Sequence, residues 1–165
     1  MAFRMRPEVD DWFKNIFKQG PIQTKFDLYY LCLMMGLATG QCEKAASGQD
    51  FVDYFVAEYK PVQRLILGLF IMAEIARLGL EVSDREDVRK LINGYLDPTN
   101  PAHLKEDGFA KLNDYANAGF NVIVKEQGDN RPHHVEVFVQ WYAQALSNKV
   151  KGNPYWASFG EGVKG

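Results

Sequence analysis

The sequence predicts an all-α fold, a single-domain bundle of six to seven helices with an irregular C-terminal tail. Apolar residues recur at spacings of three and four over most of the chain, as they do along one face of an α-helix. Prolines, glycines and capping residues interrupt this pattern where helices would end. With 165 residues, 47% of them hydrophobic and 24% charged, the chain is long enough to enclose one core.

The first predicted helix begins at Pro7, which suits the first helical position, and ends before Gly20-Pro21. A second helix begins at Thr24, which with Asp27 resembles a capping box, and ends within Gly36–Gly40. This second helix is apolar nearly all round, so we expect it at the centre of the bundle. The first helix carries its apolar residues on one stripe: Val9, Trp12, Phe13, Ile16 and Phe17.

A loop over residues 41–49 is predicted to follow, and then a short third helix from Asp50 to Tyr59. Pro61 ends this helix, because a proline disfavours the α conformation of the residue before it. The same Pro61 opens a fourth helix, which Gly79 closes.

Ser83 and Glu86 form a capping box that predicts a fifth helix. The prolines and polar residues of 97–101 predict a turn, after which a sixth helix runs from Leu104 or Phe109 to Phe120.

The stretch 121–141 is open to two interpretations. Residues 121–125 and 135–141 alternate between apolar and polar types around Gly128–Pro132, which fits a β-hairpin. Over a longer window, Val135 to Leu146 follows a helical period, and helix is the interpretation we favour.

The C-terminal segment shows no helical period. Residues 149–165 combine glycines, lysines and aromatic residues. We therefore divide the chain into a helical domain at 1–148 and a docking tail at 149–165.

Two sequence motifs resemble those of enzymes, but neither lies in the structural context that its chemistry needs. The run Gly160-Glu-Gly162-Val-Lys-Gly165 spells a dinucleotide fingerprint, which needs a strand before it and a helix after it. Asp53, Glu58 and Lys60 mimic a nuclease core, but they fall in the predicted third helix rather than on a hairpin. We expect no catalytic residue, no cofactor and no metal.

The remaining candidates for chemistry are histidines and cysteines. His133 and His134 are adjacent, so their side chains do not converge on one ligand. A hydrolase that uses both histidines together with Asp129 is an alternative function, which we rank third. Cys32 and Cys42 are too few for a disulfide framework.

Basic residues gather at the two ends of the chain. Residues 1–25 hold five basic and three acidic residues, and residues 148–165 hold three basic residues and one acidic residue. Residues 81–107, in contrast, hold seven acidic and four basic residues. Such ends could contact nucleic acid, directly or through a complex, and a helical DNA- or RNA-binding module is the second alternative for function. The candidate contacts are Arg4, Arg6, Lys149 and Lys151.

Aromatic residues, at 13%, exceed what a core of this size needs, and several are adjacent in sequence. Neighbours on a helix cannot both face one core, and exposed aromatic residues are enriched at protein interfaces. The predicted partner-binding residues are Tyr155, Trp156, Phe159, Trp141 and Tyr142, and we expect Tyr29-Tyr30 to be a further exposed pair.

Two pieces of the chain, about 25 residues together, carry a resemblance to a known group. They are Gly20-Pro21-Ile-Gln-Thr24-Lys-Phe-Asp27 with the following Leu31-Cys-Leu-Met-Met-Gly36-Leu-Ala, and Leu112-Asn-Asp-Tyr115-Ala-Asn-Ala-Gly119-Phe120. These pieces resemble small helical accessory proteins of bacterial DNA phosphorothioation and neighbouring anti-phage defence operons. The resemblance implies an accessory subunit of a defence assembly and assigns no active-site residue.

Together these observations predict a non-catalytic accessory or adaptor subunit of a multi-protein complex. We expect its partners to be one or more protein subunits. No segment has the length of a signal sequence or a membrane span, so we expect a cytoplasmic protein without membrane contact.

Overall fold

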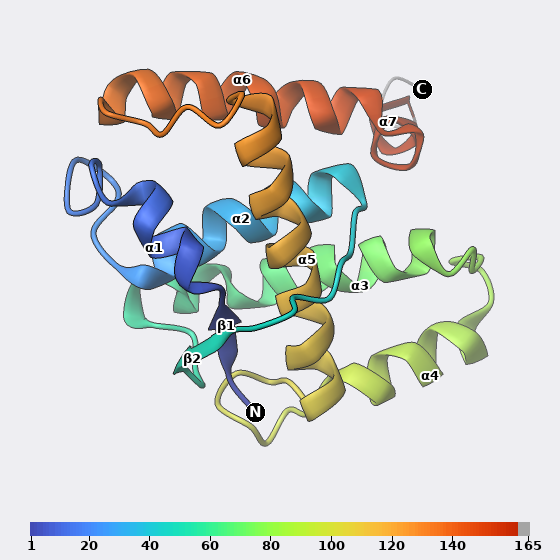
Figure 1. Cartoon of the computed structure of the whole chain (residues 1–165). Helices are drawn as coiled ribbons and strands as arrows, with labels where there is room; N and C mark the ends of the chain where they lie inside the picture. The colour runs from blue at the N-terminus through green and yellow to red at the C-terminus, as the bar shows by residue number, and fades with distance from the viewer. Residues whose placement is uncertain (162–165) are drawn as a thin grey trace.

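The computed structural model describes residues 1–161 and confirms the all-α class (Figure 1). The only sheet of this part of the chain has two short strands, β1 (Phe3–Met5) and β2 (Gln49–Val52), and a 3-10 helix, η1, spans Ala57–Val62. The α-helices are α1 (Pro7–Phe13), α2 (Lys25–Thr39), α3 (Gln63–Arg77), α4 (Arg85–Tyr95), α5 (Glu106–Glu126), α6 (Val135–Gly152) and α7 (Pro154–Glu161).

The core is built around the crossing of α2 and α5 (Figure 1). Gly36 of α2 and Gly119 of α5 lie at this crossing, where a Cβ on Gly119 would overlap the carbonyl oxygen of Cys32. A Cβ on Gly36 would overlap the carbonyl oxygen of Tyr115 in the same way. The two glycines therefore let the backbones approach more closely than any other residue pair would allow. The prediction that the second helix is central is confirmed, because α2 is buried along most of its length.

The N-terminal strand β1 pairs with β2 in antiparallel orientation, with Phe3 opposite Val52 and Arg4 opposite Asp50. Phe3 is fully buried, and its ring contacts four other aromatic rings at centroid distances of 5.1–5.2 Å: those of Phe26, Tyr29, Phe55 and Phe109. Aromatic burial therefore anchors the N-terminus against α2 and α5.

The predicted third helix over Asp50–Tyr59 is wrong. Its first residues form β2, and helical structure begins only with η1 at Ala57. The chain extends here because β1, far away in sequence, supplies the hydrogen bonds that a strand needs, and local periodicity carries no information about such a partner.

The predicted ends of α2 are correct, whereas the predicted N-cap of α4 is displaced by one residue. Thr24 and Asp27 form the predicted capping box, and α2 ends at Gly40 with a φ of 72°. The predicted box of Ser83 and Glu86 does not form, because Asp84 takes the cap position and accepts a hydrogen bond from the amide of Asp87.

The stretch 121–141 is helical on both sides of a turn, so the hairpin interpretation is wrong. α5 continues to Glu126 and α6 begins at Val135. Gly128, with a φ of 61°, lies in the connection between them.

The segment predicted as an irregular tail is also helical as far as it is described. α6 continues to Gly152, and α7 begins at Pro154 after Asn153, whose Oδ1 accepts a hydrogen bond from the amide of Tyr155. Asn before Pro is a helix-start signal that the apolar pattern alone did not reveal. Residues 162–165 of the predicted tail, including the end of its glycine-rich run, lie outside the described residues.

Candidate functional site

A cavity of about 260 Å³ lies between three segments: the N-terminal segment, α5, and the loop that precedes β2. Arg4 and Arg6 line it from the N-terminal side, and Asn113 and Asn117 line it from α5. Residues 44–48 form its loop wall. The site therefore depends on three segments that are far apart in sequence.

Three asparagines spaced four residues apart on α5 hold these segments together: Asn113, Asn117 and Asn121. The Oδ1 atom of Asn113 accepts hydrogen bonds from the backbone amide of Arg4 at 3.0 Å and from the hydroxyl of Tyr29 at 2.9 Å. Its Nδ2 donates to the carbonyl oxygen of Ala2 at 3.0 Å. Asn113 therefore fixes the N-terminal strand on α5.

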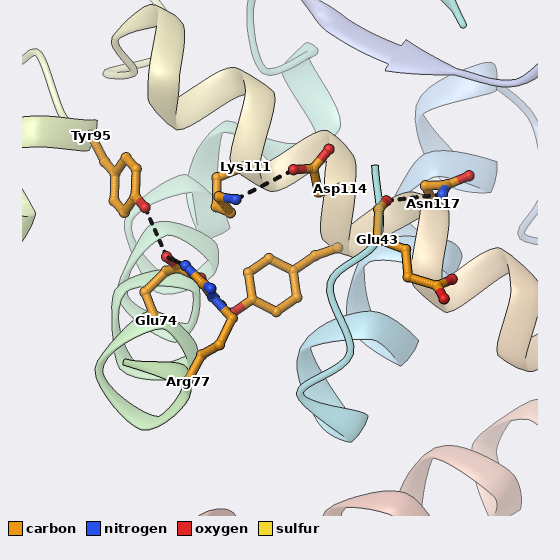
Figure 2. Close-up of polar contacts among 8 residues, drawn as sticks. Glu43, Glu74, Arg77, Tyr95, Lys111, Asp114 and Asn117 are labelled. Atoms are coloured by element: carbon orange, nitrogen blue, oxygen red, sulfur yellow. Dashed lines mark hydrogen bonds and ion pairs between the residues drawn. The ribbon is translucent and has the colours of Figure 1, made fainter. Parts of the chain in front are cut away.

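Asn117 and Asn121 fix the loop before β2 through Glu43. Asn117 Nδ2 donates to the carbonyl oxygen of Glu43 at 2.9 Å (Figure 2). Asn121 Nδ2 donates to the Glu43 carboxylate, also at 2.9 Å. Asn121 also accepts a hydrogen bond from Arg6 Nη2 at 2.9 Å. The same helix face thus positions both the loop wall and one arginine of the cavity.

Two buried polar atoms of the cavity-lining residues have no hydrogen-bond partner within the described part of the chain. They are Nε of Arg6 and Oδ1 of Asn117, a donor and an acceptor. The Arg6 guanidinium also lies 4.8 Å from the ring centroid of Phe120, which holds its place. An unsatisfied buried polar group is costly, and a water molecule or a ligand that pairs with it removes that cost.

A buried carboxylate, Glu74 of α3, joins three helices (Figure 2). Its side chain is 0% exposed and accepts hydrogen bonds at 2.6 and 2.8 Å from Arg77, at 2.8 Å from Tyr95 and at 2.7 Å from Tyr115. Burial raises the pKa of Glu74, but the hydrogen bonds from Arg77, Tyr115 and Tyr95 outweigh it and hold the pKa below its ordinary value. A carboxylate that remains ionised and fully paired is suited to structure rather than to proton transfer near neutral pH.

The two thiols are poor nucleophiles. Both cysteines are free, and burial raises the pKa of Cys32 to about 12 and that of Cys42 to about 11. A thiol reacts as its thiolate, which both side chains form only at high pH. Among residues 1–161 no cluster of three or more His, Cys, Asp or Glu side chains is arranged to hold a metal ion.

The described structure shows no contact that supports a hydrolase using Asp129, His133 and His134. His133 Nδ1 lies 3.3 Å from the side-chain nitrogen Nδ2 of Asn15, and His134 occupies the N-cap position of α6. No hydrogen bond or ion pair joins Asp129 to either histidine in the described chain.

The predicted partner-binding aromatics fall into two groups. Tyr142 is 7% exposed and donates its hydroxyl to the carbonyl oxygen of Leu31, so the expectation that it faces a partner is corrected. Trp156 packs on the core and donates Nε1 to the carbonyl oxygen of Leu37 at 3.0 Å, and Tyr155 packs beside it. Phe159 remains 44% exposed, and Trp141 lies partly buried beside an open groove.

The four predicted nucleic-acid contacts do not form one patch. Arg4 pairs with Asp50 at 2.7 Å, and Lys149 pairs with Glu126 at 2.7 Å. Figure 1 places β1 and the end of α6, which carries Lys149 and Lys151, in separate parts of the molecule. The structure brings Arg4 and Arg6 together at the cavity instead.

The outer face of α3 is a feature that we did not predict from the sequence. Its members are apolar and are less buried than the residues of α3 that face the core. They are the exposed Leu65 and Gly68 and the half-buried Leu69, Met72 and Ala76, of which Leu69 also packs against the core, and they are called here the α3 outer face. Leu65 is 62% exposed, and a Cβ on Gly68 would meet no atom within 4 Å. The sequence signal was the run of apolar residues at 65–73, which occupies every side of the helix, but only the structure shows that one side of it lies at the surface.

Comparison with protein-family models, with curated proteins and with solved structures finds no match to this chain. Among the described helices, none has both the length and the apolar character required to cross a bilayer.

Proposed function

We propose that this chain is a non-catalytic accessory subunit that docks onto another protein through the α3 outer face. The observation that carries the proposal is that five residues on one side of α3 are all apolar and that one of them, Leu65, is 62% exposed. A helix face in contact with water normally carries polar residues, whereas an apolar face is normally covered.

The shape of the face also suits a partner. Leu65 projects from the helix, and one turn further along Gly68 leaves open space above the backbone. A protruding side chain next to a hollow allows interdigitation with a second helix. The groups that could perform chemistry support the same proposal, because Glu74 is fully paired and both thiols have raised pKa values.

The proposal extends to the kind of assembly. The resemblance to accessory proteins of bacterial DNA phosphorothioation and anti-phage defence operons favours a defence complex acting on foreign DNA. Two unpaired cysteines favour a cytoplasmic location, because thiols persist in reducing compartments.

Co-purification from the native cells tests the proposal, comparing Leu65→Glu with Val137→Glu. The two side chains are 62% and 64% exposed, on α3 and α6 respectively, so both substitutions leave the core intact. We expect the wild type and Val137→Glu to bring down the same stoichiometric partner and Leu65→Glu to lose it. Equal recovery with both variants would contradict the proposal, as would a wild-type chain that only self-associates in sedimentation velocity.

A further inference from the structure

The charge of the cavity walls is predominantly positive. Arg4, Arg6 and Lys44 supply three cationic side chains, and Asp114 supplies the one carboxylate in the lining. Asp114 lies 3.4 Å from Lys111, which neutralises it (Figure 2). Arg4 is paired in turn with Asp50 at 2.7 Å, so Arg6 and Lys44 carry the excess positive charge. An anion entering this space therefore meets an excess of positive charge.

The loop wall adds hydrogen-bond donors. Residues 44–48 read Lys-Ala-Ala-Ser-Gly, and none of their backbone amides donates a hydrogen bond to another part of the described chain. Small side chains leave the amides of such a loop accessible, and successive free amides favour anions. Gly48 has a further role, because a Cβ there would lie 2.6 Å from Cγ and Cδ of Arg4 and would displace that arginine from the wall.

The unpartnered atoms fit the same kind of ligand. The Arg6 guanidinium lies over Phe120 and donates Nη2 to Asn121, which leaves Nε as the donor that an oxyanion could pair. Asn117 Oδ1 is an acceptor that a ligand hydroxyl or amine could pair. The volume of about 260 Å³ is below the ~300–1,000 Å³ of typical small-molecule pockets, so the ligand must be compact.

We propose that this cavity is a binding site for a compact oxyanion, a small molecule that carries a phosphate or carboxylate group. Arg6 and Lys44 contact the anionic group, the amides of 44–48 donate to it, and Asn117 accepts from a neighbouring polar group. This site is separate from the α3 outer face, so it stands or fails independently of the docking proposal.

Amide NMR of the full chain tests the site, with inorganic phosphate and succinate as probes and sodium chloride as the ionic-strength control. Saturable shifts confined to residues 44–48, the N-terminal segment and the side-chain amides of Asn113 and Asn117 would support the proposal. Tighter binding of phosphate would assign a phosphate ligand, and tighter binding of succinate would assign a carboxylate. Shifts that do not saturate, or that chloride reproduces, would overturn the proposal.

Variants at Ala110 make the test specific, because this residue lines the cavity and is exposed on α5. We expect Ala110→Glu to weaken binding of the better probe about tenfold or more through charge repulsion, and Ala110→Gln, of nearly equal size, to bind like the wild type. Lys44→Gln should weaken binding severalfold, whereas Lys151→Gln on α6 should not. Wild-type affinity in Ala110→Glu, with an unchanged melting temperature, would overturn the proposal.

Discussion

Gly119 faces Gly36 where α5 crosses α2, so closely that a Cβ on Gly119 would lie 2.6 Å from the backbone nitrogen of Gly36. The neighbouring atoms are backbone and cannot rotate away, unlike the end of a flexible side chain. The closeness of the two central helices therefore depends on the absence of side chains at both positions.

Gly119→Ala should destabilise the protein by about 3 kcal/mol or more, because the added methyl forces the two backbones apart. The measurement is urea unfolding followed by circular dichroism. Gly68→Ala is the matched control, because a Cβ there meets nothing within 4 Å and alanine favours the helix by roughly 0.5–1 kcal/mol. Similar stability of the two variants would show that the helices do not approach as described.

Glu74→Gln should cost about 3–5 kcal/mol, because it leaves Arg77 and two phenols without their buried acceptor charge. Urea unfolding at pH 7 measures this cost. Glu86→Gln on α4 is the control, because its side chain is 80% exposed and should change stability by less than ~0.5 kcal/mol. A cost for Glu74→Gln no larger than that of the control would contradict the pairing.

The same carboxylate predicts a pH dependence. The folded pKa of Glu74 lies below its unfolded value, so its contribution is complete above the unfolded pKa of about 4.3 and is lost as the pH falls through the folded pKa. Unfolding free energies measured from pH 7 to pH 3 should therefore fall more steeply for the wild type than for Glu74→Gln. Parallel curves would show that Glu74 has an ordinary pKa in the folded protein.

Trp156→Ala should lower stability by about 2 kcal/mol, because Trp156 packs on the core and its Nε1 donates to the carbonyl oxygen of Leu37 at the end of α2. Thermal melting compares it with Phe159→Ala, whose side chain is 44% exposed and should matter by less than ~0.5 kcal/mol. If Trp156→Ala melts like the wild type, α7 does not stabilise the domain.

Cys42 should alkylate slowly at pH 8 and faster as the pH approaches 11, because burial raises the pKa of its thiol to about 11. Cys32→Ser isolates this reaction, and mass spectrometry after iodoacetamide treatment measures it. Rapid labelling at pH 7 would contradict the raised pKa and reopen thiol chemistry at this site.

Features that depend on neighbouring residues were predictable from the sequence. The capping box of Thr24 and Asp27 and the terminator Gly40 set the ends of α2, and each acts within a few residues. Features that depend on distant partners were not. Residues 50–52 have a plausible helical pattern, and only pairing with β1 makes them a strand.

The candidate sites divide in the same way. Glu74 within an apolar run, with Arg77 three residues later, was a visible signal of an internal ion pair, but Tyr95 and Tyr115 come from other helices. The period of four that joins Asn113, Asn117 and Asn121 was visible too. That this row would hold the N-terminus and a loop around a cavity could not be read from spacing, because both lie far away along the chain.

Docking through the α3 outer face is tested most directly by hydroxyl-radical footprinting of the isolated chain and of its purified native assembly. If this face docks, labelling of Leu65 and Met72 falls severalfold in the assembly, while labelling of Val137, which is similarly exposed on α6, remains unchanged. Equal labelling of Leu65 in the two samples would contradict it.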